Sequence, residues 1–246
     1  MHRFFLPPDC IHASWVSFPP ETAHQIYAVL RMKTGQEVVV LDNNGAAFRV
    51  RLENLQPSSA TGVILETLPI TSEPRTRLTL YLGLTQREKF EWVLQKGTEV
   101  GIIAFVPLIT QRTLVREITV AREKLPRWRR IVQEAAEQCG RGRIPEVHPP
   151  LELERAIKQA QTTTSLCLMA WEGENQRSLR QAIRSLSMSP EEVALIIGPE
   201  GGLSPNEVLR AQQAGWLTCS LGTRILRMET AAILGAALTL YELNDL

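Results

Sequence analysis

The most constraining stretch of this chain joins a short apolar run to a glycine-rich turn and a helix start. Val193–Ile197 is apolar and ends at a glycine, which is typical of a strand buried on both faces. Residues 198–202 (GPEGG) supply glycines that let a ligand approach the main chain closely. Ser204 then predicts a helix N-cap, with Pro205 at the first helical position and Glu207 closing a capping box. Such a unit predicts an open α/β sheet with a ligand at the strand's carboxyl end.

The rest of the region from residue 77 onward alternates between strand and helix patterns. Strand patterns occupy residues 78–84, 102–108, 165–171 and 216–221, and helix patterns occupy residues 87–100, 123–139, 151–160, 176–186 and 228–243. This alternation predicts a mostly parallel sheet with helices on both faces.

The N-terminal region is β-rich instead. Strands are expected at residues 37–41, 46–52 and 61–68, with a turn at 42–45 and a short helix at 22–30. A small β-barrel or half-barrel is the expected result. The polar, turn-prone segment 70–74 places the domain boundary after residue 72, which divides the chain into domains 1–72 and 73–246.

Composition excludes several classes of protein. No apolar run approaches the roughly 20 residues that a membrane helix needs, and the N-terminus lacks the apolar core of a signal peptide. The four cysteines lie far apart and the four histidines show no ligand spacing, so neither disulfides nor a metal site are expected. We therefore expect a cytoplasmic protein with no membrane partner.

The charge distribution is more informative than the net charge of +1. Residues 73–146 carry 14 Lys and Arg against 9 Asp and Glu, an excess that could bind a phosphate backbone. A solvated helix face is an equally good interpretation of the charge alone. The candidate contacts to such a backbone in this region are Arg112, Arg141 and Arg143. Gln138 is a candidate base contact, although on spacing alone such a residue is more often a surface residue.

A second glycine turn, residues 221–230 (LGTRILRMET), follows the last predicted strand. Arg224 and Arg227 could hold an anion, orient Glu229 or simply lie in solvent. The phosphate-binding signatures GxxxxGK[ST] and GxGxxG do not occur in the sequence. The acidic Glu200 in the first turn suits a neutral or cationic ligand with hydroxyl groups better than a triphosphate.

Four stretches together resemble the bacterial ribosomal RNA small subunit methyltransferase E family, which methylates N3 of a uridine in 16S rRNA and belongs to the SPOUT superfamily. They are residues 89–101 (KFEWVLQKGTEVG), 131–145 (IVQEAAEQCGRGRIP), 195–208 (LIIGPEGGLSPNEV) and 221–233 (LGTRILRMETAAI). The resemblance covers the whole chain. One departure is Gln111, where the family more often has Glu, although Arg112 is retained.

The resemblance implies a fold, a cofactor and partners. The fold is α/β, with a SPOUT-type trefoil knot near the C-terminus and a PUA-like β-barrel at the N-terminus. The protein would form a homodimer, bind S-adenosylmethionine and act on 16S rRNA or the small ribosomal subunit. The implied cofactor residues are Glu172, Gly198, Pro199, Glu200, Gly201, Gly202, Leu221, Gly222, Ile225, Leu226 and Arg227.

The chemistry of uridine N3 suggests roles for individual residues. N3 carries a proton at neutral pH, so an enzyme must favour the anionic base with a general base or a nearby cation. N3 also lies on the pairing edge, so the target must be unpaired or flipped into the pocket. Arg227 is the predicted stabiliser of the uridinate, and Glu229 is a weaker candidate for a base that more naturally anchors the turn. In the N-terminal domain, Arg3 is the predicted RNA contact.

Three other functions are also compatible with the sequence. A SPOUT enzyme acting on a ribose 2′-hydroxyl or a tRNA base is the nearest. A non-catalytic RNA-binding assembly factor is the second, and the intact glycine turns and Arg227 weigh against it. A metabolite-binding α/β enzyme is the third, and the positive charge of residues 73–146 weighs against it.

Overall fold

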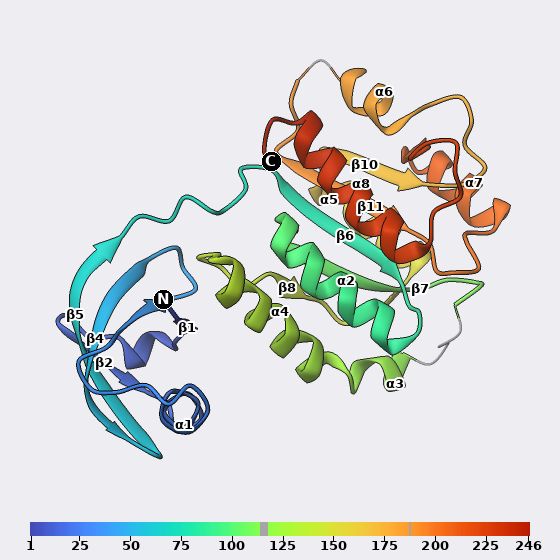
Figure 1. Cartoon of the computed structure of the whole chain (residues 1–246). Helices are drawn as coiled ribbons and strands as arrows, with labels where there is room; N and C mark the ends of the chain where they lie inside the picture. Colours follow the sequence, from blue (N-terminus) through green and yellow to red (C-terminus); the bar gives the residue numbers. More distant parts are fainter. Residues whose placement is uncertain (114–117, 187) are drawn as a thin grey trace. The chain divides into compact units, whose positions relative to one another are not determined.

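The computed structural model describes residues 1–113, 118–186 and 188–246. The chain divides into two compact units, one made of Met1–Glu73 and Gln133–Ile144 and the other of Pro74–Val132 and Pro145–Leu246. The expected boundary after residue 72 lies one residue from this division. Residues 133–144, however, group with the N-terminal unit and not with the C-terminal domain as expected. Figure 1 shows the helices and strands of both units and labels most of them.

The N-terminal unit contains a five-stranded sheet in the order β1-β3-β4-β5-β2. Its strands are β1 (Arg3–Phe5), β2 (Trp15–Phe18), β3 (Glu37–Leu41), β4 (Ala47–Gln56) and β5 (Ser59–Leu68). The predicted hairpin is present as the antiparallel pair β3–β4, whereas β1 and β2 were not predicted. Within residues 1–73 no ladder joins β1 to β2, so the sheet is open and corresponds to the half-barrel alternative. The expected helix at 22–30 is α1 (Pro20–His24) continued by a π-helical turn, η2 (Gln25–Val29), and η1 (Pro8–Cys10) precedes it.

Strand β3 is buried on both faces, which explains its uninterrupted apolar sequence. Val38 and Val40 belong to the core beneath the sheet. Val39 and Leu41 pack on the other side in a cluster that contains Ala136. Because Ala136 packs in this second cluster, residues 133–144 belong to the N-terminal unit.

A buried ion pair also fixes this segment. Arg141 is only 3 % exposed, and its guanidinium donates to the Glu73 carboxylate at 2.9 Å. The same carboxylate accepts hydrogen bonds from the N–H groups of Gly142 at 2.8 Å and Arg143 at 3.2 Å. The prediction that Arg141 contacts RNA is therefore corrected: its charge is committed to a structural contact inside the unit.

The second unit is built on a seven-stranded sheet in the order β12-β10-β11-β6-β7-β8, with β9 also paired to β7. The strands are β6 (Arg77–Gly83), β7 (Ala104–Ile109), β8 (Glu146–Val147), β9 (Leu151–Glu152), β10 (Leu166–Ala170), β11 (Glu192–Ile197) and β12 (Leu217–Cys219). Each described pair of neighbouring strands is parallel, which confirms the predicted parallel sheet.

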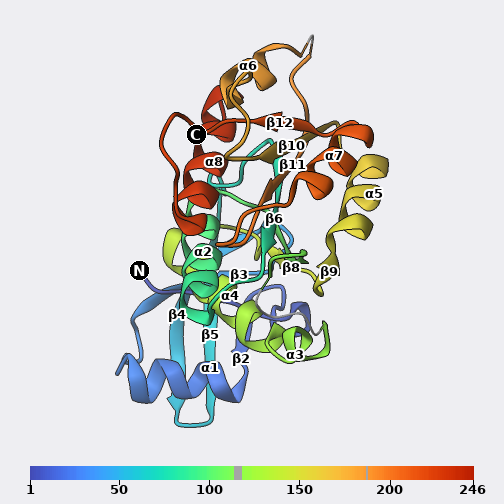
Figure 2. The same cartoon turned by 90° about the vertical axis from the view of Figure 1, so that its right-hand side faces the viewer.

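Helices cover both faces of this sheet, with α2 and α8 on one face and α5 and α7 on the other (Figure 2). The described helices are α2 (Arg87–Val100), α3 (Ile118–Arg122), α4 (Leu125–Cys139), α5 (Leu153–Thr163), α6 (Leu179–Arg184), α7 (Pro205–Gln213) and α8 (Met228–Glu242). The helix expected from residue 151 begins at residue 153, because residues 151–152 pair with β7. None of the described helices has the length and apolar character required to cross a bilayer.

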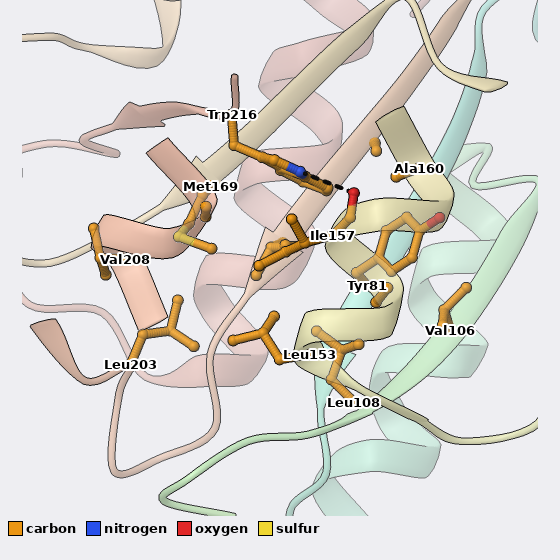
Figure 3. Packing of buried hydrophobic residues seen from close by; sticks show 14 residues of the cluster. Tyr81, Val106, Leu108, Leu153, Ile157, Ala160, Met169, Leu203, Val208 and Trp216 are labelled. Atoms are coloured by element: carbon orange, nitrogen blue, oxygen red, sulfur yellow. Dashed lines mark hydrogen bonds between the residues drawn. The ribbon is translucent and has the colours of Figure 1, made fainter. Parts of the chain in front are cut away.

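The core between the sheet and helices α5 and α7 is organised around Trp216 (Figure 3). Its indole N–H donates to the Ile157 carbonyl at 3.4 Å, and its ring meets Tyr81 edge-on at 6.0 Å between centroids. On the opposite face, α8 approaches β11 closely. A Cβ on Gly235 would lie 3.2 Å from Leu195 Cδ2, so packing inside the unit already accounts for the small residue at this position.

Replacing Glu73 with Ala tests the structural role of Arg141. The variant should lose about 2–3 kcal/mol of unfolding free energy, because a buried guanidinium and two backbone N–H groups lose an acceptor. The matched control is Glu192→Ala, which breaks the exposed pair with Arg77 and should cost about 1 kcal/mol or less. Urea denaturation followed by circular dichroism measures both, and equal losses would contradict the assignment.

Candidate active site

Three neighbouring parallel strands end beside one cavity. Ala170, the last residue of β10, pairs with Ile197 of β11 and with Cys219 of β12. The segments that follow these strands line a cavity of about 700 Å³. Because carboxyl ends of parallel strands meet at one edge of a sheet, segments far apart in sequence converge here, as the two glycine turns predict.

The sequence-predicted cofactor residues lie together around this cavity. Its lining includes Glu172, Gly198, Pro199, Glu200, Gly201, Gly202, Leu221, Gly222, Ile225, Leu226 and Arg227. Glu229, the predicted anchor or base, lines it as well. Sequence reasoning missed the contribution of Lys89, which reaches the cavity from α2, and that of Trp171 at the end of β10.

The first loop, residues 198–202, is packed tightly between its neighbours. A Cβ on Gly83, at the end of β6, would lie 2.4 Å from the Pro199 nitrogen, so only glycine at 83 permits the loop to cross there. Gly202 has φ +69°, and a Cβ on it would lie 2.3 Å from Glu172 Oε1. The loop therefore lies against β6 on one side and against Glu172 on the other.

The capping box predicted at the start of α7 is present and holds the end of this loop. Ser204 Oγ accepts from the Glu207 N–H at 3.3 Å, and the Glu207 carboxylate accepts from the Ser204 N–H at 2.7 Å. The same carboxylate accepts from the Gln111 N–H at 2.7 Å. Glu207 thus ties the first loop to the turn that follows β7.

The second loop ends where α8 begins. Gly222 has φ +124°, and its N–H donates to Ser220 Oγ at 3.2 Å. Arg227 is the N-cap residue of α8, and its exposed side chain lines the cavity. Among the described residues, none forms an ion pair with the Arg227 guanidinium, so its charge is available to a ligand. Glu229 lies in the first turn of α8, with its Oε2 buried and unpartnered among described groups.

Two charged side chains meet at the edge of the cavity. Lys89 Nζ donates to Glu200 Oε1 at 2.7 Å. Partial burial acts to raise the pKa of the Glu200 carboxyl, but hydrogen bonding from the Lys89 and Thr85 side chains, together with the Lys89 charge and a backbone hydrogen bond, outweighs it, so the pKa lies below its ordinary value. Glu200 is therefore ionised at neutral pH.

Two cysteines lie on β10 and β12, the strands that end beside the cavity. Burial raises the pKa of the Cys219 thiol to about 12 and that of Cys167 to about 11, so both thiols are protonated at neutral pH. Among residues 1–113, 118–186 and 188–246, no group of three His, Cys, Asp or Glu side chains is placed to hold a metal ion.

The predicted RNA-contact residues are divided between the two units. Arg3, Gln138 and Arg143 belong to the N-terminal unit, where Gln138 and Arg143 are exposed. Arg143 donates to the Asn44 carbonyl at 3.1 Å. Arg112 belongs to the other unit and donates to the Gly201 carbonyl at 2.9 Å, so it touches the first loop directly.

Comparison with known proteins identifies the family that this chain matches. A model of an RNA methyltransferase domain matches residues 71–240, and a model of an RNA methyltransferase PUA domain matches residues 18–65. The ribosomal RNA small subunit methyltransferase E of Synechocystis sp. is 34% identical over 96% of this chain and 76% of that protein. The protein of the same name from Bacillus subtilis is 30% identical over 98% of this chain and 97% of its own length.

Solved structures give the same result. A ribosomal RNA small subunit methyltransferase E from Neisseria gonorrhoeae, bound to S-adenosyl methionine, has a TM-score of 0.87 at 28% identity, covering 98% of this chain and 97% of that one. A methyltransferase from Legionella pneumophila in complex with the same cofactor has a TM-score of 0.87 at 30% identity, covering 97% of this chain and 96% of that one. The chain therefore belongs to the ribosomal RNA small subunit methyltransferase E family.

Proposed function

We propose that this protein transfers a methyl group from S-adenosylmethionine to N3 of a uridine in 16S rRNA. The observation that carries the proposal is the convergence of both glycine loops and Arg227 on one cavity. Family membership supports RNA methylation, and two similar solved structures contain the same cofactor.

The cavity fits such a cofactor. Its volume of about 700 Å³ lies in the range of small-molecule sites. Backbone N–H and C=O groups of the loops at 198–202 and 221–227 would bind the adenine and ribose. Glu172 supplies negative charge on the side of the first loop, which suits the sulfonium and ammonium groups of the ligand. When bound, S-adenosylmethionine supplies an electrophilic methyl group.

The chain's own residues would make N3 reactive. The N3 proton must leave before or during methylation, which places negative charge on the uracil ring. Arg227 lies at the cavity with its charge available, so it would stabilise the uridinate and orient it. Glu229 lines the same cavity from the first turn of α8. We assign it the role of an anchor for the turn, with a general base as the alternative that its unpartnered Oε2 leaves open.

The RNA would be held by residues outside the cavity. Arg3, Gln138 and Arg143 are the proposed contacts in the N-terminal unit, and Arg112 is the proposed contact beside the first loop. A homodimer, a cytoplasmic location and a trefoil knot in the C-terminal segment remain predictions that follow from the resemblance.

Nucleoside analysis tests the function directly. Labelled S-adenosylmethionine and small ribosomal subunits that lack the modification should yield a single product, N3-methyluridine. A ribose-methylated nucleoside would be consistent with a methyltransferase but would contradict the proposal that N3 is the target atom. Absence of any product with the cofactor bound would contradict the proposed substrate.

Arg227→Ala tests the stabilisation of the uridinate. The variant should lose about 10²- to 10³-fold in kcat, the usual effect of removing one preorganised group from a developing anion. Arg180→Ala is the control, because Arg180 is an exposed arginine of α6 paired with Glu242, away from the cavity. Full turnover by a folded Arg227→Ala protein would falsify the assignment.

Glu229→Gln separates an anchor from a base. An amide keeps the shape and hydrogen-bonding capacity of the side chain but accepts no proton, so an anchor should retain kcat within about threefold. A general base would lose about 10²-fold or more in the same variant. Single-turnover methyl transfer across a range of pH measures the difference, and a large loss at neutral pH that diminishes at high pH, where N3 loses its proton without a base, would reassign Glu229 as the base.

A further inference from the structure

The first loop is held by groups that lie outside its own glycine motif. Pro199 crosses β6 at Gly83, and the Gly201 carbonyl accepts from Arg112 at 2.9 Å. Inside the loop, the Gly202 N–H donates to the Pro199 carbonyl at 2.8 Å. The backbone is thus fixed on either side of residue 200, whose side chain extends out of the loop.

That side chain is bound by Lys89, a residue 111 positions earlier in the chain. The two atoms are 2.7 Å apart, and the side chains of Lys89 and Glu200 are 34% and 29% exposed. Both residues line the cavity. Partial burial strengthens a charge-assisted hydrogen bond relative to one on an open surface.

Two roles for Glu200 predict different behaviour. A carboxylate that binds a cationic ligand directly would have Lys89 as a competitor, so loss of Lys89 would tighten ligand binding. A carboxylate that anchors the loop would need Lys89, so loss of Lys89 would weaken ligand binding. The Lys89 ammonium already occupies Glu200 Oε1 at 2.7 Å, and this favours the second role.

We propose that Lys89 is a positioning residue, whose ion pair with Glu200 holds the 198–202 loop in the shape that binds the cofactor. Glu200 then acts through this pair, while the loop backbone contacts the ligand. The inference rests on the proposed function, because the ligand in question is the methyl donor.

A double-mutant cycle tests the pair. Lys89→Met, Glu200→Gln and the double variant are titrated with S-adenosylmethionine by calorimetry. Each single variant should bind about tenfold more weakly, as expected for loss of one charge-assisted hydrogen bond. The double variant should bind within about twofold of the weaker single variant, because the second change removes nothing further.

Two further variants serve as controls. Lys89→Arg keeps a cation that can reach the carboxylate and should bind within about threefold of the wild type. Lys96→Met removes a lysine of the same helix that pairs with Glu99 at 2.8 Å and does not line the cavity. Its affinity should be unchanged.

Hydrogen exchange of the ligand-free protein supplies an independent readout. The Gly202 amide, which is bonded to the Pro199 carbonyl, should exchange faster in Lys89→Met than in the wild type or in Lys96→Met. Unchanged exchange at Gly202, tighter binding by Lys89→Met, or losses that multiply in the double variant would each overturn the proposal. If the wild type bound no S-adenosylmethionine, the proposed function would fail, while exchange at Gly202 would still decide whether the pair fixes the loop.

Discussion

The convergence of three parallel strand ends is the constraint on which the site depends. The register that places Ala170 between Ile197 and Cys219 brings the following segments to one edge of the sheet. The packed core around Trp216 maintains that register from one face, and α8 maintains it from the other. A change that slid β10 against either neighbour would separate the two glycine loops, even though both loops remained intact in sequence.

Charge in the cavity is divided between its two loops. Glu172 and Glu200 lie on the side of the first loop, and Arg224 and Arg227 belong to the second. Because Lys89 is paired with Glu200, Glu172 is the remaining carboxylate on the first side. A cationic donor next to a base that becomes anionic would match this division. The electrostatics and the proposed chemistry therefore agree.

Local signals in the sequence predicted much of this arrangement. The capping box at Ser204 and the helix at 87–100 were correct, because neighbouring residues alone determine them. The glycine loops were found for the same reason. Gly83 was missed as a site determinant, because its importance arises only when Pro199 crosses over it.

Long-range contacts account for the errors. Arg141 has the sequence pattern of a surface arginine, and its burial depends on Glu73, which lies 68 residues earlier. Residues 133–139 continue a helix that begins in the other unit, so periodicity could not show that Ala136 packs with the N-terminal sheet. Lys89 was missed for a similar reason, because its partner Glu200 comes from a distant loop. Such contacts form between residues far apart in the sequence, so they can be recognised only in the folded chain.

A crystal structure of this protein grown with S-adenosylmethionine would show whether the two glycine loops enclose the methyl donor. We expect ligand density between residues 198–202 and 221–227, with the adenine on loop backbone groups and the methyl group facing the Arg227 side chain. Density elsewhere on the protein, or an empty cavity in crystals of a protein shown to bind the cofactor, would mean that the loops do not form the cofactor site.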